Sequence, residues 1–405
     1  MALLDRILDP ASRADPYPLY ERLRETPVAR QPDGTYVVST YDEVVALLHD
    51  PRLSSDPRNH PGSDDLTASP DGLPMEFIRL DPPEHDRLRD AAMRPFGPPH
   101  TPGRIQALRP WLTDFSNDLI DGFAGRTQVD LVEEFAYPLP VAAICRLLGV
   151  PREDQPRFHE WADALIRTFD PSTGTFPQRQ EARNAATAEL GRYLAALVDD
   201  RGDHPGDDLI SGMLADPGPH GPLARGDIVA TSALLLVAGH ETTVNLIANG
   251  MLTLLRHPDH LDRLRRDPDR AVPLVEELLR YEPPVHMITS RSTLADIDVD
   301  GTTIPAGSPL MLMLAAASRD PKRFTEPDQF NPDRPDNQHL GYGSGIHYCF
   351  GAPLARVETQ VALAALAQRL VNPRLASDPP PYRPNPTLRG PSHLPIEFDA
   401  IRPAP

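Results

Sequence analysis

Cysteine is almost absent from this chain of 405 residues, which contains only Cys145 and Cys349. Two cysteines so far apart cannot build a disulfide framework, and their scarcity predicts a reducing compartment. Long hydrophobic runs are missing as well, because no stretch approaches the roughly 18 consecutive apolar residues of a membrane-spanning helix. The first residues show no signal-peptide pattern. We therefore expect a soluble, cytoplasmic protein with no membrane partner.

Positive charge is also in short supply. The chain has 40 lysines and arginines against 58 aspartates and glutamates, a net charge of -18 at pH 7. This excess argues against general affinity for nucleic acid, which we do not expect as a partner. A dinucleotide-binding glycine motif is absent too: Gly343 and Gly345 are not followed by the rest of such a fingerprint. We therefore expect no built-in flavin or nicotinamide site.

What the chain does contain is a glycine-rich stretch that delivers a cysteine to the start of a helix, YGSGIHYCFGAPLAR over residues 342–356. Residues 354–371 are apolar at helical spacing without glycine or proline, and Pro353 suits a first helical turn. The glycines allow tight turns and close backbone approach. Loop amides and the positive end of the helix should favour thiolate over thiol at Cys349.

Three chemistries are compatible with a thiolate at Cys349. It could act as a nucleophile with His347 as its base. It could hold zinc, although zinc needs three or four ligands and the chain offers two cysteines and scattered histidines. It could ligate a haem iron, which needs one axial cysteine and a backbone able to lie close under a flat macrocycle. The residues alone leave these alternatives open.

The glycine-rich stretch resembles the haem-binding signature of the cytochrome P-450 family, F-G-x-G-x-H-x-C-x-G, with Tyr342 in place of the usual phenylalanine. The resemblance implies haem b (iron protoporphyrin IX) with an axial thiolate from Cys349, Gly351 against the cofactor, and His347 anchoring a propionate. In this family the thiolate pushes electron density onto the iron and favours O–O cleavage. It also implies the fold class: mainly α (α+β), a single catalytic domain over 1–405, with a helical bundle around a buried haem and small β-sheets.

A second key element is a helix predicted over residues 227–256, which at 1.5 Å per residue would span roughly 45 Å and cross the whole protein. Residues 228–239 carry no charge. In the middle, Glu241 is an acid that needs a function or a partner if the helix is buried. The Thr242 hydroxyl can bond back to the carbonyl of Ala238 and bend the helix. A kinked helix with a satisfied acid would explain these residues equally well.

By resemblance, residues 238–242 match the family's A-G-x-[DE]-T motif. Glu241 and Thr242 would then be the catalytic acid–alcohol pair that supplies protons for oxygen activation, and Ala238 would line the substrate pocket. His240 occupies the variable position of the motif, and we interpret it as structural.

Residues 81–84 (DPPE) predict a helix start with Asp81 as its cap and Glu84 completing a capping box. His85 and Arg89 then share one face of that helix, which by spacing alone fits a solvated polar surface. By resemblance the two residues contact a haem propionate, a carboxylate that would otherwise be buried without a partner.

A strand is predicted over residues 285–290, with Arg291 at its end. By resemblance Arg291 pairs with a propionate, while Val285 and Ile288 line the substrate pocket. Pocket shape should also depend on a long loop over residues 52–75 and on the region 165–185, where residues 170–178 break two helices.

Glu277 and Arg280 lie three residues apart on a predicted helix, which by itself describes a surface ion pair worth under about 1 kcal/mol. By resemblance they form the family's E-x-x-R motif, with Arg334 as the third member of a structural network that braces the loop of Cys349. Cys145 lies in an apolar run and is interpreted as core packing.

Together these motifs imply a soluble bacterial cytochrome P-450, a haem-thiolate monooxygenase that inserts one atom of O2 into a small organic substrate by hydroxylation or epoxidation. Tailoring of a secondary metabolite is the role we expect by family analogy. Electrons should come from ferredoxin and ferredoxin reductase, docking on a monomer near Arg356 and Arg87 or Arg94. Alternatives are a non-catalytic haem-thiolate sensor, a P-450 that performs oxidative coupling, a cysteine hydrolase and a zinc protein.

Overall fold

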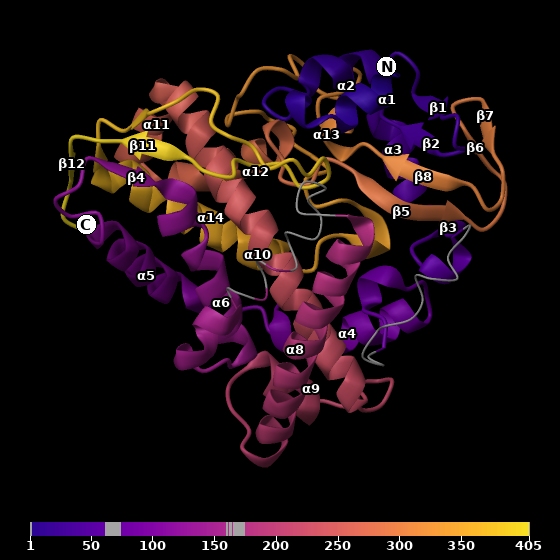
Figure 1. Ribbon diagram of the computed structural model, residues 1–405, viewed down its shortest axis with the longest axis horizontal. Coiled ribbons are helices and arrows are strands. Elements are labelled where there is room, and N and C mark those ends of the chain that lie inside the picture. Colours follow the sequence, from indigo (N-terminus) through magenta and orange to yellow (C-terminus); the bar gives the residue numbers. More distant parts are fainter. Residues whose placement is uncertain (1, 61–73, 159–160, 162–163, 165–174, 405) are drawn as a thin grey trace.

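Helices dominate the computed structural model, which describes residues 2–60, 74–158, 161, 164 and 175–404 (Figure 1). The loop expected over 52–75 and the helix break expected over 170–178 lie largely outside these residues. The helices are α1 (Leu3–Leu8), α2 (Tyr17–Arg24), α3 (Tyr41–Leu48), α4 (Glu84–Phe96), α5 (Arg109–Asp121), α6 (Pro138–Leu148), α8 (Phe176–Asp203), α9 (Leu209–Ala215), α10 (Arg225–Arg256), α11 (Pro258–Arg266), α12 (Ala271–Tyr281), α13 (Leu314–Ala317) and α14 (Ala352–Arg369).

The strands form small sheets beside the helices. The largest sheet has the order β1 (Val28–Arg30), β2 (Tyr36–Val38), β8 (Pro309–Leu312), β5 (Ile288–Thr293) and β3 (Leu53–Ser54). A second sheet has the order β10 (Arg374–Leu375), β11 (Pro395–Glu397) and β4 (Gln128–Asp130). Two strand pairs complete the set, β6 (Ile297–Val299) with β7 (Thr302–Ile304) and β9 (Leu370–Val371) with β12 (Ala400–Ile401).

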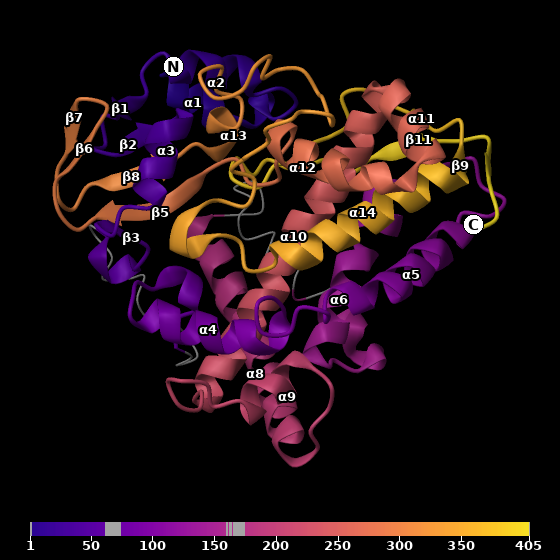
Figure 2. The same ribbon diagram turned by 180° about the vertical axis from the view of Figure 1, so that it is seen from behind.

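The predicted long helix is confirmed as α10, which has 32 residues and therefore spans about 48 Å at 1.5 Å per residue. It runs through the middle of the molecule (Figure 1) and packs against α6, α8, α12 and α14. Gly250 permits the close crossing with α14, because a Cβ atom there would lie 2.9 Å from Leu363 Cδ1. From behind, α14 is seen alongside α5, its other main neighbour (Figure 2).

Two predicted boundaries were wrong. Helix α4 begins at Glu84 without a side-chain cap, because Asp81 instead accepts hydrogen bonds from Ser54 Oγ at 2.5 Å and from the Ser55 amide at 2.8 Å. The strand predicted over 285–290 is β5, which begins at Ile288. Arg291 therefore lies inside the strand rather than at its end, where it pairs with Leu310 of β8.

The ion pair between Glu277 and Arg280 is buried, contrary to the surface pair that its spacing suggested. Both side chains are fully inaccessible, and Arg280 Nη2 lies 2.7 Å from Glu277 Oε1. Arg334 joins through Nε, 3.4 Å from Glu277 Oε2. The Arg280 guanidinium also donates to the carbonyl groups of Ser318, Pro327 and Gln329. The network thereby fixes the chain that leads into the cysteine loop.

Substituting Arg280→Met should lower the free energy of unfolding by about 3–5 kcal/mol, because it strands the buried Glu277 carboxylate. The double variant E277Q/R280M should recover part of that loss, since the stranded charge is gone. Chemical denaturation measures both. Arg270→Met, which removes a surface pair with Asp333, is the control and should change the unfolding midpoint little. A double variant as unstable as the sum of the two single variants would contradict the coupling.

Candidate active site

The cysteine loop is held in place by close backbone contacts. Cys349 follows a short 3₁₀ turn over Gly345–His347 and precedes α14, and its amide donates to the Tyr342 carbonyl at 2.9 Å. Gly345 has a φ of +70°, and a Cβ atom there would lie 2.1 Å from the carbonyl oxygen of Leu48. Only glycine fits this position, because two backbones meet at it.

The surroundings of Cys349 act on the pKa of its thiol in two opposite directions. Burial raises the pKa of its thiol, and this outweighs the opposing effects of the Gly351 and Ala352 amides and of Arg89 and Arg356. The Gly351 and Ala352 amides favour the thiolate, as the sequence suggested, but burial, a tertiary property that the local sequence does not report, has the larger effect. A positive charge at the sulfur, such as that of a metal ion, would favour the thiolate further.

Four nitrogen-bearing side chains gather beside the loop. His85 and Arg89 come from α4, Arg291 from β5 and His347 from the turn before Cys349. The two imidazole rings lie 4.4 Å apart. Burial, followed by the charges of Arg291, His85 and Arg89, lowers the pKa of His347 to about 3. The structure thus brings together residues that lie far apart in the sequence.

This cluster contains more positive charge than the surrounding protein neutralises. Burial lowers the pKa of Arg291 to about 10, and among the described residues its guanidinium forms no ion pair and donates to the Ser290 carbonyl. Arg89 donates to the Tyr348 carbonyl at 2.6 Å. Nε2 of His85 and Nδ1 of His347 are buried without a hydrogen-bond partner in the described part of the chain. Such a group of donors fits an anion with several oxygen atoms.

Helix α10 leaves one stripe of its surface open within an otherwise buried length. Ala238 is exposed, and Leu234 and Thr242, one turn away on either side, are only partly buried. Thr242 Oγ1 donates to the Ala238 carbonyl at 2.8 Å, as predicted from the sequence. His240, on another face, is buried edge-to-face against Tyr137 at 4.4 Å between ring centroids. The stripe is therefore the side of α10 available to a ligand.

Glu241 is buried, and two side chains that belong to no recognised sequence motif bind it. Arg383 forms an ion pair with its Oε1 at 2.8 Å, and Asn245 Nδ2 lies 3.3 Å from the same oxygen. Asn245 lies one turn after Glu241 on α10, so its contact with Glu241 could have been predicted from helical spacing. Arg383 stands in a proline-rich segment near the end of the chain, and nothing in the sequence pointed to it.

Comparison with known proteins decides the family. The family described as Cytochrome P-450 matches residues 32–385. The cytochrome P-450 monooxygenase PikC of Streptomyces venezuelae is 42% identical over 95% of this chain and 91% of its own length. The 6-deoxyerythronolide B hydroxylase of Saccharopolyspora erythraea is 36% identical over 95% and 96%. The ligand-free crystal structure of CYP164A2 from Mycobacterium smegmatis is 42% identical, with a TM-score of 0.87 over 98% and 99% of the two chains.

The chain belongs to the cytochrome P-450 family. It is a P-450 monooxygenase, and its cofactor is haem b with a cysteine as axial ligand. The expected mainly helical P-450 fold with small sheets is confirmed. In the described residues, no helix is long and apolar enough to span a membrane.

The residues present fit a haem. The excess of positive charge would suit two propionates, and Ala238 and Thr242 on the open stripe of α10 would be available to contact the cofactor or its substrate. Gly351 adds a third observation, because a Cβ atom there would meet no atom of the described chain within 4 Å, so the protein itself leaves that space clear.

The described residues of this P-450 supply neither the base that a nucleophilic cysteine needs nor the ligand cluster that zinc needs. His347 has a pKa of about 3, too low for a base at neutral pH, and its Nε2 lies 2.8 Å from Ser55 Oγ. No group of three or more candidate metal-ligating side chains occurs within the described ranges. Cys145 is fully buried, and burial raises the pKa of its thiol to about 12, as expected of core packing.

The three arginines expected to form a docking face are already neutralised in the P-450 structure. Their carboxylate partners are Glu276 for Arg356, Glu84 and Asp227 for Arg87, and Asp90 and Asp216 for Arg94. These residues do not form a free basic patch. Exposed Ile346 and Tyr348 of the cysteine loop add apolar surface nearby.

Two of the predicted pocket residues, Val285 and Ile288, lie just before and at the start of β5. Val285 forms a β-bridge with Leu388, and Ile288 begins β5. Both are partly buried at the edge of a core cluster that contains β2 and β8 residues. The described contacts do not join either residue to Ala238, so their place in the pocket stays a prediction.

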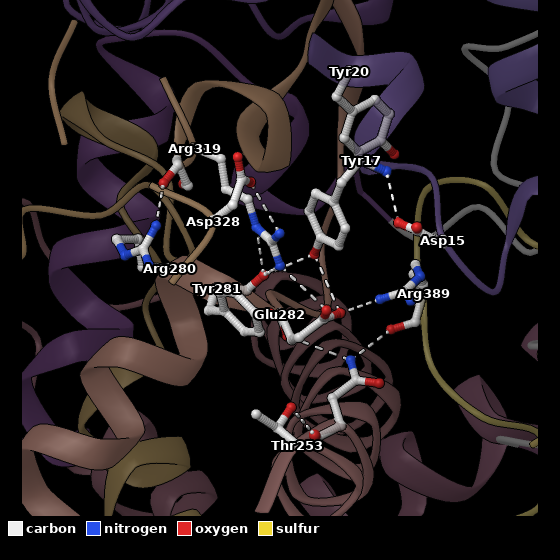
Figure 3. Close-up of polar contacts among 12 residues, drawn as sticks. Asp15, Tyr17, Tyr20, Thr253, Arg280, Tyr281, Glu282, Arg319, Asp328 and Arg389 are labelled. Atoms are coloured by element: carbon white, nitrogen blue, oxygen red, sulfur yellow. Dashed lines mark hydrogen bonds and ion pairs between the residues drawn. The ribbon is translucent and has the colours of Figure 1, made fainter. Parts of the chain in front are cut away.

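A second polar cluster anchors the C-terminal segment of the P-450 to the N-terminal segment and to the end of α12 (Figure 3). Arg389 pairs with Glu282 and donates to the carbonyls of Arg13 at 2.7 Å and Ala14 at 2.9 Å. Tyr17 donates its hydroxyl to Glu282 Oε2 at 3.2 Å. Both ends of the chain are thereby tied to the end of α12.

Glu358 is a buried acid beside α10. It lies on α14, is 1% exposed and hydrogen-bonds Thr243 of α10. Burial raises its pKa well above the ordinary value of 4.5. Thr243, which carried no assigned role in the sequence, thus joins the helix after the cysteine to the long helix.

Substituting Gly345→Ala should destabilise the protein more than Gly343→Ala. Both glycines have positive φ, near +70°, but a Cβ atom on Gly343 meets nothing within 4 Å. Left-handed backbone costs an alanine about 1–2 kcal/mol, and G345A adds a collision with the Leu48 carbonyl. Thermal unfolding and haem content measure both variants. Equal losses would show that the contact with α3 does not constrain the loop.

Glu358 should make stability fall as pH rises. Above about pH 4.5 the unfolded chain releases this proton while the folded protein keeps it, so Glu358→Gln should gain stability relative to the parent between about pH 5 and pH 8. Thermal unfolding at both pH values measures this difference.

Glu134→Gln serves as a control of opposite sign. The hydrogen bond from Arg126 is the main cause lowering the pKa of Glu134, so its contribution is present above about pH 4.5 and lost on acidification. A stability difference between E358Q and the parent that did not change with pH would mean that Glu358 is not a buried neutral acid.

Proposed function

We propose that Cys349 ligates the haem iron and that His85, Arg89, Arg291 and His347 bind the propionates, with Gly351 lying under the ring. The observation that carries this proposal is the cluster of nitrogen groups beside the cysteine loop, in which neither Arg89 nor Arg291 forms an ion pair with a described residue. Cys145 lies in a closed apolar core with its pKa raised to about 12, which makes it a poor ligand. Bound haem supplies oxygen binding and O–O cleavage, which no side chain can provide.

The residues of α10 act on protons in this proposal. Thr242 keeps its hydroxyl on the open stripe by donating to Ala238, which leaves the oxygen free to accept a proton or hold a water molecule. Glu241, adjacent in sequence, is buried with Arg383 and Asn245 and exchanges protons between solvent and that hydroxyl. The acid–alcohol pair thus excludes bulk water while still providing a route for protons.

The reaction proposed is insertion of one oxygen atom into a C–H or C=C bond of a small organic substrate. For hydroxylation, R–H, O2, two electrons and two protons give R–OH and water. The electrons come from a reduced ferredoxin that ferredoxin reductase regenerates. Since Arg356, Arg87 and Arg94 are paired, the apolar surface of Ile346 and Tyr348 contributes to docking alongside any charge.

The substrate proposed is a secondary metabolite. Support comes from the named hydroxylase of 6-deoxyerythronolide B among the relatives. Ala238, Val285 and Ile288 are the pocket residues proposed, and all three are small or aliphatic, which suits an apolar substrate surface.

The carbon monoxide complex of the reduced protein tests the ligand. The parent should show the strongly red-shifted Soret band of thiolate-ligated haem, and Cys349→Ala should lose it. Cys145→Ala is the matched control and should keep it, because its sulfur lies in the apolar core. A red-shifted band that survives in C349A and disappears in C145A would overturn the assignment.

A further inference from the structure

The acid of α10 has a partner from a distant part of the chain. Arg383 lies 2.8 Å from Glu241 Oε1, with the carboxylate side chain 4% and the guanidinium side chain 19% exposed. Asn245 binds the same oxygen at 3.3 Å. A carboxylate this deeply buried depends on a counter-charge and on donors that fix its direction. Arg383 supplies the charge, and Asn245 supplies a second donor.

The segment that carries Arg383 is firmly held against α10. The Arg383 amide donates to the Gly390 carbonyl at 3.2 Å. A Cβ atom on Gly390 would lie 2.1 Å from Asn245 Oδ1. The backbone at Gly390 therefore packs directly against Asn245, the second residue that binds Glu241. Asn249 Nδ2 donates to the Arg389 carbonyl at 3.0 Å, and Arg389 is anchored to Glu282 (Figure 3).

The same segment also contacts the residues just before β5, including Val285, which is proposed to line the substrate pocket. The Thr387 carbonyl accepts from the His286 amide at 2.8 Å, and Leu388 forms a β-bridge with Val285. Residues 382–391 therefore contact the acid on one side and the strand region on the other.

We propose that Arg383 is a positioning residue for proton delivery, and that residues 382–391 tie the charge and direction of Glu241 to the wall of the substrate pocket. The proposal rests on the proposed function, in which Glu241 passes protons to Thr242. In each transfer one proton enters the carboxylate from solvent and one leaves it toward the Thr242 hydroxyl, so Glu241 itself is unchanged. Arg383 touches neither substrate nor cofactor in this scheme.

The kinetic test compares Arg383→Gln and Arg383→Lys with the parent, using reduced ferredoxin and a substrate that gives a binding spectrum. In R383Q, kcat should fall roughly 10- to 100-fold, the range of general acid–base effects, with KM unchanged and a larger solvent deuterium isotope effect. R383K should lie between R383Q and the parent, since lysine keeps the charge but not the planar donors. Arg374→Gln is the matched control: it removes pairs with Glu397 and Asp399 from the same C-terminal region and should leave kcat unchanged.

A second readout needs no turnover. The infrared difference between the parent and Glu241→Gln should show carboxylate bands, because Arg383 keeps Glu241 ionised. In R383Q these bands should give way to the carbonyl band of a protonated carboxyl group, while R383K retains them.

The outcomes separate the two proposals. A protonated Glu241 in the parent, or an R383Q variant with parental kcat and isotope effect, overturns the positioning role. If R383Q does not fold, R383K decides: a lowered kcat with a larger isotope effect supports the role, and parental values overturn it. Failure of the parent to oxygenate any substrate, together with the expected infrared change, overturns the proposed function and leaves the ion pair established.

Discussion

The protein gathers positive charge that it does not itself neutralise, and the structure around the cysteine depends on this imbalance. Arg291 on β5 and Arg89 on α4 come from two separate elements that meet beside the cysteine loop. Burying guanidinium groups without an anion is costly. A cofactor with two carboxylates and a metal ion would lower that cost and would favour the thiolate form of Cys349. Folding of this region and binding of haem are therefore one coupled equilibrium.

The parts that could be predicted from the sequence are those in which a local pattern alone determines the secondary structure or the hydrogen bond. The helical spacing and absence of charge over residues 228–239 sufficed for α10, and the bond from Thr242 to Ala238 follows from the geometry of one helical turn. The cysteine loop was recognisable because its glycines are required by backbone contacts, as Gly345 against Leu48 shows. The family, and with it the fold class, followed from these motifs.

The parts that could not be predicted depend on tertiary partners. The sequence places Asp81 where it could cap α4, but in the structure its carboxylate accepts hydrogen bonds from residues 54 and 55 instead. The spacing of Glu277 and Arg280 is that of any surface pair, and only the fold buries it. Burial of Cys349 outweighs the local donors. Arg383 stands in a proline-rich stretch, so its contact with Glu241 exists only once the chain has closed on itself.

The anchoring of Arg389 on the carbonyls of Arg13 and Ala14 has a consequence for how the molecule is made. These residues are 376 and 375 positions apart in the chain, so their contact is among the most non-local in the structure. During synthesis the N-terminal helices are made first, and residues 13 and 14 cannot contact Arg389 until the segment that carries it has been made. The contacts of Arg389 with Arg13 and Ala14 can therefore form only after α14, the helix that follows Cys349, has been synthesised.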